Sequence, residues 1–329
     1  MTIYGRWFLL LTSLLLILAQ GAPAQEAPRE FTAWLAQLRA DAGAAGISQK
    51  TLDAALANLV APEPRVIERD QTQPEKTTSL KDYVTTRVSP ERIAEGRLML
   101  RRYRSWLDRI ERQYRVQQRF LVALWGIESS YGRHAGGHPV IPALVSLAFD
   151  GRRGDYFRRE LLEALKIVDD GHVSLARLKG SWAGAMGPFQ FMPSSYRHYA
   201  VDGDGDGRIN IWGSVPDALA SAANYLVKAG WKHDQTWGRQ VTLPQPFDRQ
   251  LADLDSRMPL SRWQTLGVRR SNGDALPRRN LQASLILADG PQGSAYLVYD
   301  NFRALRRWNR SNSFAVAVGT LADSYQQKR

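Results

Sequence analysis

Apolar residues recur at intervals of three and four positions along most of the chain, and this spacing predicts a mainly helical protein. Ser48 and Ser89 stand where helix N-caps are favoured, and Pro90 suits the first turn of a helix. The predicted helical segments are residues 31–38, 48–59, 90–110, 117–131, 141–149, 156–169, 193–199, 215–229 and 302–326.

A different pattern occupies the late part of the chain. Residues 282–287 and 294–299 are rich in apolar and β-branched side chains and flank Gly290-Pro291-Gln292-Gly293, which predicts a β-hairpin. Residues 241–243 are a further candidate strand, whereas the prolines at 62 and 64 and the polar stretch 70–78 indicate a connecting loop. The expected fold is therefore mainly α, of the α+β kind, with a small β insertion.

The first 24 residues have the pattern of an export signal. Arg6 precedes an apolar stretch over residues 7–18, and Ala22-Pro23-Ala24 matches the small-residue pattern of a cleavage site. An uncleaved membrane anchor is the alternative, but the apolar stretch is short for a bilayer span. We expect residues 1–24 to be a signal peptide, with no stable membrane span after its cleavage.

Composition narrows the compartment and the partner. The chain has no cysteine, so it has no disulfide framework and no cysteine for lipid attachment, and a soluble periplasmic protein that is not a lipoprotein is expected. Its formal charge of +12 favours a polyanionic partner. Nucleic acid would satisfy the charge, but the export signal argues against it and favours peptidoglycan. We expect a monomer.

Glu128 is the acidic residue with the most unusual setting. On a helix that continues through Tyr131, its neighbours at i−4, i−3 and i+3 would be Leu124, Trp125 and Tyr131. A carboxyl group against such apolar surface has a raised pKa and can hold a proton near neutral pH, as a general acid must. An ion-paired structural glutamate is the alternative, and the local pattern by itself favours it.

Four stretches together reverse that preference. They are residues 123–132 (ALWGIESSYG), 181–196 (SWAGAMGPFQFMPSSY), 202–212 (DGDGDGRINIW) followed by 222–226 (AANYL), and 308–311 (WNRS). In order and spacing, from about residue 30 to the C-terminus, this set resembles the lytic murein transglycosylases of the membrane-bound B type, including their soluble forms. Each stretch alone is a weak signal, and the set is specific.

The resemblance implies a lysozyme-like catalytic core with an added helical lobe and a small β lobe. In residues 25–329, the helical lobe would span about 28–115, the core about 116–232 and 301–329, and the β lobe about 235–300. Glu128 would be the sole catalytic acid and base. The implied substrate-binding residues are Tyr83, Ser181, Gln190, Tyr225, Trp308 and Asn309.

Two positions depart from the family pattern. Trp308 and Phe314 stand where members often have tyrosine. Stacking on the face of a sugar would survive both changes, but a phenolic hydrogen bond would not.

The implied reaction needs one carboxyl group, whereas most glycosidases place two about the scissile bond. Glu128 would protonate the oxygen of the MurNAc–GlcNAc β-1,4 bond and then take the proton of the muramoyl 6-hydroxyl. The product would be a 1,6-anhydro-MurNAc end, formed without water by an intramolecular attack. Asp150 and Asp155 lie in a basic, loop-like stretch and offer no comparable second acid. The five histidines show no metal-site spacing, so no cofactor is expected for catalysis.

The stretch from Asp202 matches the first half of a calcium-binding EF-hand loop. Asp202, Asp204 and Asp206 occupy positions 1, 3 and 5, and Gly207 occupies the turn position 6. Arg208 at position 7 would offer its backbone carbonyl. A solvated turn is the alternative, but clustered acids are costly without a cation.

The second half of the loop departs from the EF-hand pattern. Position 12 is Gly213, which has no side-chain ligand, and Asp217 is the nearest replacement. A calcium ion would then be structural, and the expected metal ligands are Asp202, Asp204, Asp206, Arg208 and Asp217.

Three activities remain open at this point. The first is a peptidoglycan lytic transglycosylase, the second is a hydrolytic muramidase, and the third is a non-catalytic scaffold that binds peptidoglycan. The first two differ in the chemistry of the new glycan end, and the third predicts that Glu128 is dispensable.

Overall fold

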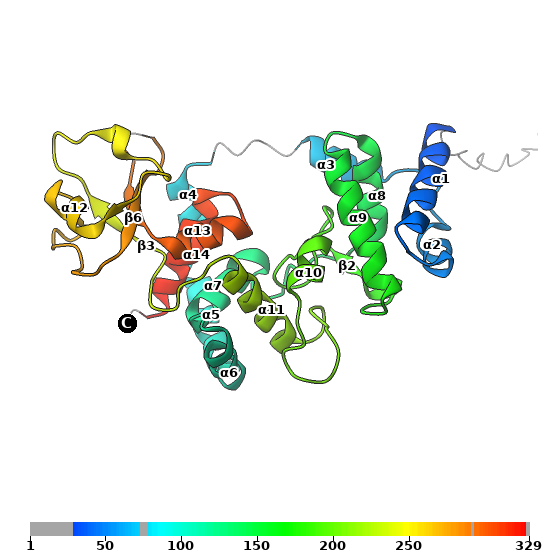
Figure 1. Cartoon of the computed structure of the whole chain (residues 1–329), viewed down its shortest axis with the longest axis horizontal. Helices are drawn as coiled ribbons and strands as arrows, with labels where there is room; N and C mark the ends of the chain where they lie inside the picture. Colours follow the sequence, from blue (N-terminus) through cyan, green and yellow to red (C-terminus); the bar gives the residue numbers. More distant parts are fainter. Residues whose placement is uncertain (1–28, 73–77, 291–292, 327–329) are drawn as a thin grey trace, which may run out of the picture.

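The computed structural model describes residues 29–72, 78–290 and 293–326, and helices predominate in it, as the sequence predicts (Figure 1). The helices are α1 (Arg29–Ala44), α2 (Gln49–Leu56), α3 (Pro64–Gln71), α4 (Leu80–Arg87), α5 (Pro90–Arg102), α6 (Arg104–Tyr114), α7 (Gln118–Ser129), α8 (Val140–Asp150), α9 (Gly154–Asp169), α10 (Pro193–Tyr199), α11 (Val215–Lys228), α12 (Leu260–Thr265), α13 (Asp300–Trp308) and α14 (Asn312–Ser324). Two short 3-10 helices lie at Leu175–Arg177 and Arg249–Leu251.

The strands form two antiparallel sheets. They are β1 (His138–Pro139), β2 (Lys179–Gly180), β3 (Gly238–Thr242), β4 (Met258–Pro259), β5 (Arg269–Arg270), β6 (Gln282–Leu287) and β7 (Ala295–Val298). The larger sheet has the order β4-β6-β7-β3-β5. The predicted hairpin is confirmed, because β6 pairs with β7 from Ser284 opposite Val298 to Leu287 opposite Ala295. Its turn residues 291–292 lie outside the described residues.

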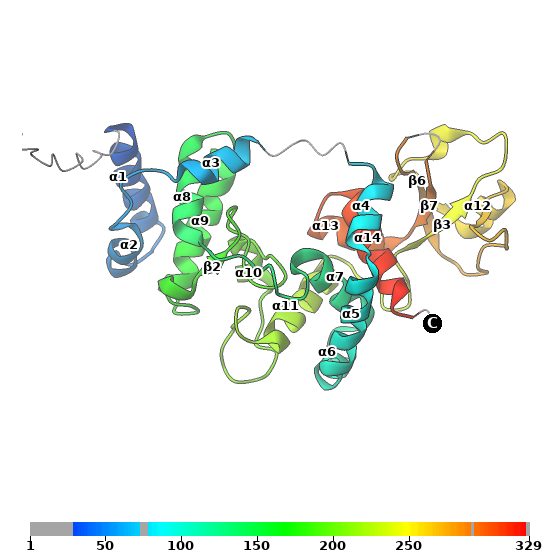
Figure 2. The same cartoon turned by 180° about the vertical axis from the view of Figure 1, so that it is seen from behind.

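The elements are strung along one long axis. α1 and α2 lie at one end and the five-stranded sheet with α12 lies at the other, while α7, α11 and α14 lie between them in both views (Figures 1 and 2). α7 therefore occupies the middle of the molecule. It packs against α5, α6, α11 and α14.

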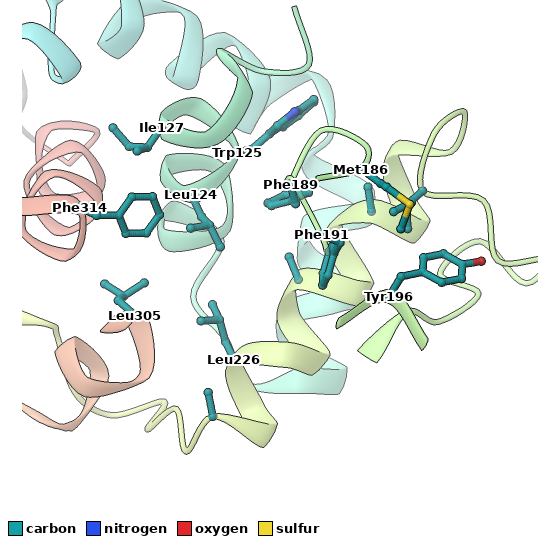
Figure 3. Packing of buried hydrophobic residues seen from close by; sticks show 14 of the residues in the cluster. Leu124, Trp125, Ile127, Met186, Phe189, Phe191, Tyr196, Leu226, Leu305 and Phe314 are labelled. Atoms are coloured by element: carbon teal, nitrogen blue, oxygen red, sulfur yellow. The ribbon is translucent and has the colours of Figure 1, made fainter. Parts of the chain in front are cut away.

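Two hydrophobic cores hold these elements. The larger runs from Phe31 to Ala322 and includes every residue of α7 from Phe120 to Trp125. Figure 3 shows Phe314 of α14 beside Leu124 of this helix. The smaller core lies between the five-stranded sheet and α12, where Trp263 is completely buried.

Local signals predicted some helix boundaries correctly and missed others. The hydroxyls of Ser48 and Ser89 accept the backbone N–H of the third residue on, which confirms both caps. The predicted loop at Pro64 is wrong, because Pro64 starts α3 and that helix buries Val66 against the core. Helix α4 was not predicted.

Two predicted long helices are each broken. Residues 90–110 do not form one helix, because Tyr103 leaves helical geometry between α5 and α6 and its ring packs on Trp125, 5.7 Å between centroids. The segment 302–326 is broken at Asn309, where the backbone is extended. Ser311 then caps α14.

The predicted division into a helical lobe, a catalytic core and a β lobe stays a prediction. The helices before and after residue 115 share the larger hydrophobic core, so their packing does not mark a boundary between the first two. The predicted signal peptide lies outside the described residues. Within the ranges that the structure describes, no helix is both long enough and apolar enough to cross a membrane.

Candidate active site

Glu128 lies in the last turn of α7, a helix with a continuous buried stretch before it. The helix ends at Ser130, whose left-handed backbone lets its N–H and that of Tyr131 turn back onto the carbonyls of Gly126 and Trp125. The tight end places Glu128 at the rim of the core. Its side chain is partly exposed.

The Glu128 carboxyl has one hydrogen-bond partner among the described residues. The indole Nε1 of Trp308 donates to Glu128 Oε1 at 2.7 Å, across 180 positions of sequence. Burial raises the pKa of Glu128 from its ordinary 4.5 to about 7, although the Trp308 hydrogen bond and the Arg87 charge act in the opposite direction. Glu128 can therefore hold a proton near neutral pH.

The expected contact with Tyr131 is wrong. Because α7 ends before it, Tyr131 is not at a helical i+3 position; its ring packs on Trp125 and its hydroxyl donates to the Arg92 carbonyl at 2.6 Å. The Tyr131 ring fits against α7 because residue 126 is glycine: a Cβ at this position would lie only 2.7 Å from the Tyr131 hydroxyl oxygen. The enclosing apolar surface of Glu128 thus includes Trp308, which comes from a distant part of the sequence.

Tyr83 and Arg87 of α4 lie near Glu128. The positive charge of Arg87 lowers the pKa of Glu128; the pKa of Tyr83 is raised mainly by its own burial, and the negative charge of Glu128 adds to that rise. The Arg87 guanidinium lies over the Tyr83 ring, 5.5 Å from its centroid. The sequence predicted Tyr83 but not Arg87.

Ser181 lies in the loop between β2 and α10. Its hydroxyl oxygen accepts the backbone N–H groups of Ala183 at 3.2 Å and Ala185 at 3.1 Å. Both contacts use the oxygen as an acceptor, so the hydroxyl proton stays free to be donated. Ser181 can therefore offer a hydrogen bond to a carbonyl or hydroxyl oxygen.

Gln190 of the same loop has the opposite preference. Its side-chain Nε2 donates to the carbonyls of Ala135 at 3.0 Å and Gly187 at 2.9 Å, which uses both N–H bonds. The amide oxygen is left to accept a hydrogen bond. A left-handed backbone at Gln190, with φ of 52°, turns the side chain into this position.

The loop is fastened to α7 and to Trp308. Ser129, next to Glu128, donates to the carbonyl of Pro188 at 2.5 Å, and the ring of Phe191 lies 5.1 Å from that of Trp308. Figure 3 shows Phe189 and Phe191 of this loop in the core close to α7. Gln190 therefore lies between Pro188, which contacts Ser129, and Phe191, which contacts Trp308.

Tyr225 of α11 completes the aromatic cluster around Trp308. The two ring centroids are 4.5 Å apart at 63°, and the Tyr225 hydroxyl donates to the carbonyl of Arg307 at 2.7 Å. Burial raises the pKa of Tyr225 to about 12, so the phenol stays neutral. Asn309, the residue after Trp308, is exposed, and its side-chain oxygen accepts the Ser311 N–H at 3.1 Å.

Phe314 does not belong to this cluster. It is 3% exposed and packs in the main core, so the expectation that it could stack on a sugar is wrong. Of the residues predicted to bind substrate, Trp308 contacts Glu128 directly, Tyr225 contacts Trp308, and the pKa of Tyr83 responds to the Glu128 charge. Ser181 and Gln190 are connected to the site by the loop between β2 and α10. Asn309 is the residue that follows Trp308.

Two carboxylates of the acidic loop converge with a third, that of Asp217, from the first turn of α11. Oxygens of Asp202, Asp204 and Asp217 lie within 4.8 Å of one another, whereas Asp206 is exposed and does not join this group. Asp217 is 1% exposed and accepts the backbone N–H groups of Gly203, Asp204 and Asn210. A group of carboxylate oxygens is the donor set that calcium prefers. Arg208 donates its N–H to Asp206 at 2.8 Å.

Two large cavities are lined by residues other than Glu128. One of about 630 Å³ adjoins the acidic loop between residues 170–177 and 207–210, and one of about 760 Å³ adjoins Arg152 and Arg153. Neither is lined by Glu128, so the predicted glycan groove stays a prediction. Arg152 and Arg153 both pair with the buried carboxylate of Asp70.

A mainly helical protein with a protonatable glutamate at the end of a buried central helix has the arrangement of the lysozyme-like fold. The chain belongs to the family described as the transglycosylase SLT domain, whose model matches residues 30–323. This result confirms the resemblance that the four sequence stretches predicted.

Three relatives show the extent of the similarity. Membrane-bound lytic murein transglycosylase B of Escherichia coli (strain K12) is 35% identical over 251 residues, which cover 72% of this chain and 64% of that protein. SltB3 from Pseudomonas aeruginosa, solved in complex with NAG-anhNAM-pentapeptide, is 44% identical with a TM-score of 0.87, covering 91% of this chain and 80% of that one. The Escherichia coli lytic transglycosylase Slt35, solved in complex with calcium, is 28% identical with a TM-score of 0.74, covering 90% and 92%.

Proposed function

We propose that this chain is a peptidoglycan lytic transglycosylase in which Glu128 acts first as an acid and then as a base. The observation that carries the proposal is a single, partly enclosed carboxyl whose pKa is raised to about 7 by burial. Membership of the transglycosylase family and the similarity to SltB3, which was solved with a muropeptide, support the substrate class.

In the proposed reaction, the Glu128 proton passes to the oxygen of the MurNAc–GlcNAc β-1,4 bond, and the bond from that oxygen to the muramoyl C1 breaks. The muramoyl 6-hydroxyl oxygen then bonds to C1, and its proton passes to the Glu128 carboxylate. The products are a free 4-hydroxyl on GlcNAc and a 1,6-anhydro-MurNAc end, and Glu128 regains its proton without any water being consumed.

The surrounding side chains can orient this substrate. Ser181 has a free hydroxyl proton that suits the N-acetyl carbonyl of a sugar, and Gln190 has a free amide oxygen that suits a hydroxyl or N–H. The exposed Asn309 keeps its side-chain NH₂ available. Tyr225 offers ring surface next to Trp308, and Tyr83 offers ring surface near Glu128.

The new glycan end identifies the reaction. Purified sacculi digested with the full chain should release muropeptides that end in 1,6-anhydro-MurNAc, which mass spectrometry separates from reducing ends by the mass of one water. Reducing MurNAc ends would instead indicate a hydrolytic muramidase. Release of no muropeptide by a folded protein would leave the peptidoglycan-binding scaffold.

We further propose that the mature chain works in the periplasm, where its substrate lies. The signal pattern in residues 1–24 supports export, and the basic charge supports attraction to the acidic stem peptides of the wall.

We also propose calcium as a structural ion at Asp202, Asp204 and Asp217. The converging carboxylate oxygens fit a hard divalent cation, and the calcium complex of Slt35 supports the choice of ion. The loop connects the Gln190 segment to α11, which carries Tyr225. A bound ion would hold these two parts of the site in a fixed relation.

Calcium should raise the melting temperature of the chain. At a free concentration about 100 times the dissociation constant, an ion that binds only the folded state adds about 2.7 kcal/mol. Thermal unfolding measured in EDTA and in calcium should show this rise in the parent and not in an Asp202→Asn, Asp204→Asn double variant. An equal rise in the variant, or no rise in the parent, would contradict the site.

A further inference from the structure

Trp308 contacts Glu128 through its indole N–H, a group that can donate a hydrogen bond but cannot accept one. Indole Nε1 carries one hydrogen and has no lone pair in the ring plane, so the Glu128 oxygen that it contacts must be the acceptor. A phenolic hydroxyl at this position could donate or accept, whereas the indole allows only one direction for the hydrogen bond.

This one-way hydrogen bond distinguishes the two oxygens of the carboxyl. In a protonated carboxyl, the carbonyl oxygen accepts hydrogen bonds better than the hydroxyl oxygen does. The 2.7 Å contact is made to Oε1, and no hydrogen bond from the described residues reaches Oε2. The acid proton is therefore favoured on Oε2.

We infer that Trp308 is a positioning residue that directs the transferable proton of Glu128 to Oε2, in addition to any contact with sugar. The inference rests on the proposed role of Glu128 as the acid. Because Oε1 stays engaged in both protonation states, Oε2 would both release the proton to the glycosidic oxygen and recover it from the 6-hydroxyl.

The indole is itself held in place on several sides. Its ring packs at 5.1 Å from Phe191 and at 4.5 Å from Tyr225, and Phe189 lies 6.3 Å away. These contacts leave the ring little freedom to swing away from Glu128. The donor is therefore pre-aligned before substrate binds.

The charged and titratable groups that face Glu128 are few. Arg87 and the neutral phenol Tyr83 approach from α4, and the uncharged indole of Trp308 approaches from α13. Arg87 and the indole N–H both favour the carboxylate, whereas burial opposes it. Removing the indole N–H should therefore raise the pKa of Glu128, because the ionised form loses its hydrogen bond.

Trp308→Phe tests the inference, since it keeps an aromatic ring and removes the donor. We expect the Glu128 pKa to rise by about one unit, the scale of one hydrogen bond to a charged group. Activity of the parent should fall as pH rises through about 7, where Glu128 loses its proton, and this alkaline limb should move upward by the same amount in the variant. The kcat should fall severalfold with KM little changed, because the carboxyl loses the donor that fixes its orientation as well as the preference of its proton for one oxygen.

The pKa is measured directly by ¹³C NMR titration of glutamate-labelled full-length protein, with the Glu128→Gln spectrum assigning the resonance. Trp231→Phe is the matched control: its indole donates to Gln117 at 2.8 Å near Phe120, eight residues and about 12 Å along α7 from Glu128. It should leave the Glu128 pKa unchanged.

An unchanged Glu128 pKa in a folded Trp308→Phe protein would overturn the inference, as would a change confined to KM, which would mark Trp308 as a sugar contact alone. The titration needs no turnover. A failure of the proposed function would instead appear in the parent itself, as the absence of anhydro ends, so the two failures are distinguishable.

Discussion

Glu128→Gln should lower the turnover of peptidoglycan by about 10⁴-fold, at the upper end of what one acid–base group contributes. The loss is expected to be large because the same carboxyl serves both proton transfers and the structure offers no second acid beside it within its described residues. Glutamine keeps the size of the side chain, and its amide oxygen can still accept from Trp308. The rate of muropeptide release from sacculi measures the effect.

The stability of the variant separates lost chemistry from lost folding. Because the folded state raises the Glu128 pKa from 4.5 to about 7, stability in the parent falls as pH rises between these values, where the unfolded chain ionises more readily. The glutamine variant escapes that penalty. It should be more stable than the parent at pH 8 and equal to it near pH 4.

The matched control for Glu128→Gln is the same change at Glu111, on α6 outside the site. It should leave turnover close to that of the parent. Substantial muropeptide release by the Glu128 variant would remove this residue from the mechanism and return attention to the scaffold hypothesis.

The sequence predicted those features whose determinants lie close together along the chain. Ser48 and Ser89 cap helices through bonds to the third residue on, and the β6–β7 hairpin needs only two strands and the turn between them. The position of β3 between β7 and β5 depends on contacts across the sheet, so no local pattern in the sequence could predict it.

In the candidate site too, the sequence predicted local features and missed those that depend on contacts between distant residues. The motif around Glu128 identified the candidate acid, but its partner Trp308 lies 180 positions away and was predicted as a sugar contact. Tyr131 was misplaced because the end of α7 depends on how its ring packs against Gly126 and Trp125. Arg87 was missed because its proximity to Glu128 depends on how α4 packs in the fold.

Asp217→Ala should destabilise the chain by about 3 kcal/mol even in EDTA. The Asp217 carboxylate is 1% exposed, with Oδ1 accepting the N–H groups of Gly203 at 2.9 Å and Asp204 at 3.3 Å, and Oδ2 accepting that of Asn210 at 2.7 Å. Alanine leaves three amides without this acceptor, at about 1 kcal/mol each. Urea unfolding followed by circular dichroism measures the loss.

Two further variants show whether buried hydrogen bonds or negative charge sets this effect. Asp206→Ala removes an exposed carboxylate that accepts one N–H, from Arg208, and should cost less than about 1 kcal/mol. Asp217→Asn removes the charge but keeps one oxygen that can accept up to two of the three N–H groups, so its cost should lie between those of Asp206→Ala and Asp217→Ala. If Asp206→Ala destabilised the chain as much as Asp217→Ala, the loop would depend on its overall charge, and the role assigned to the buried carboxylate would be wrong.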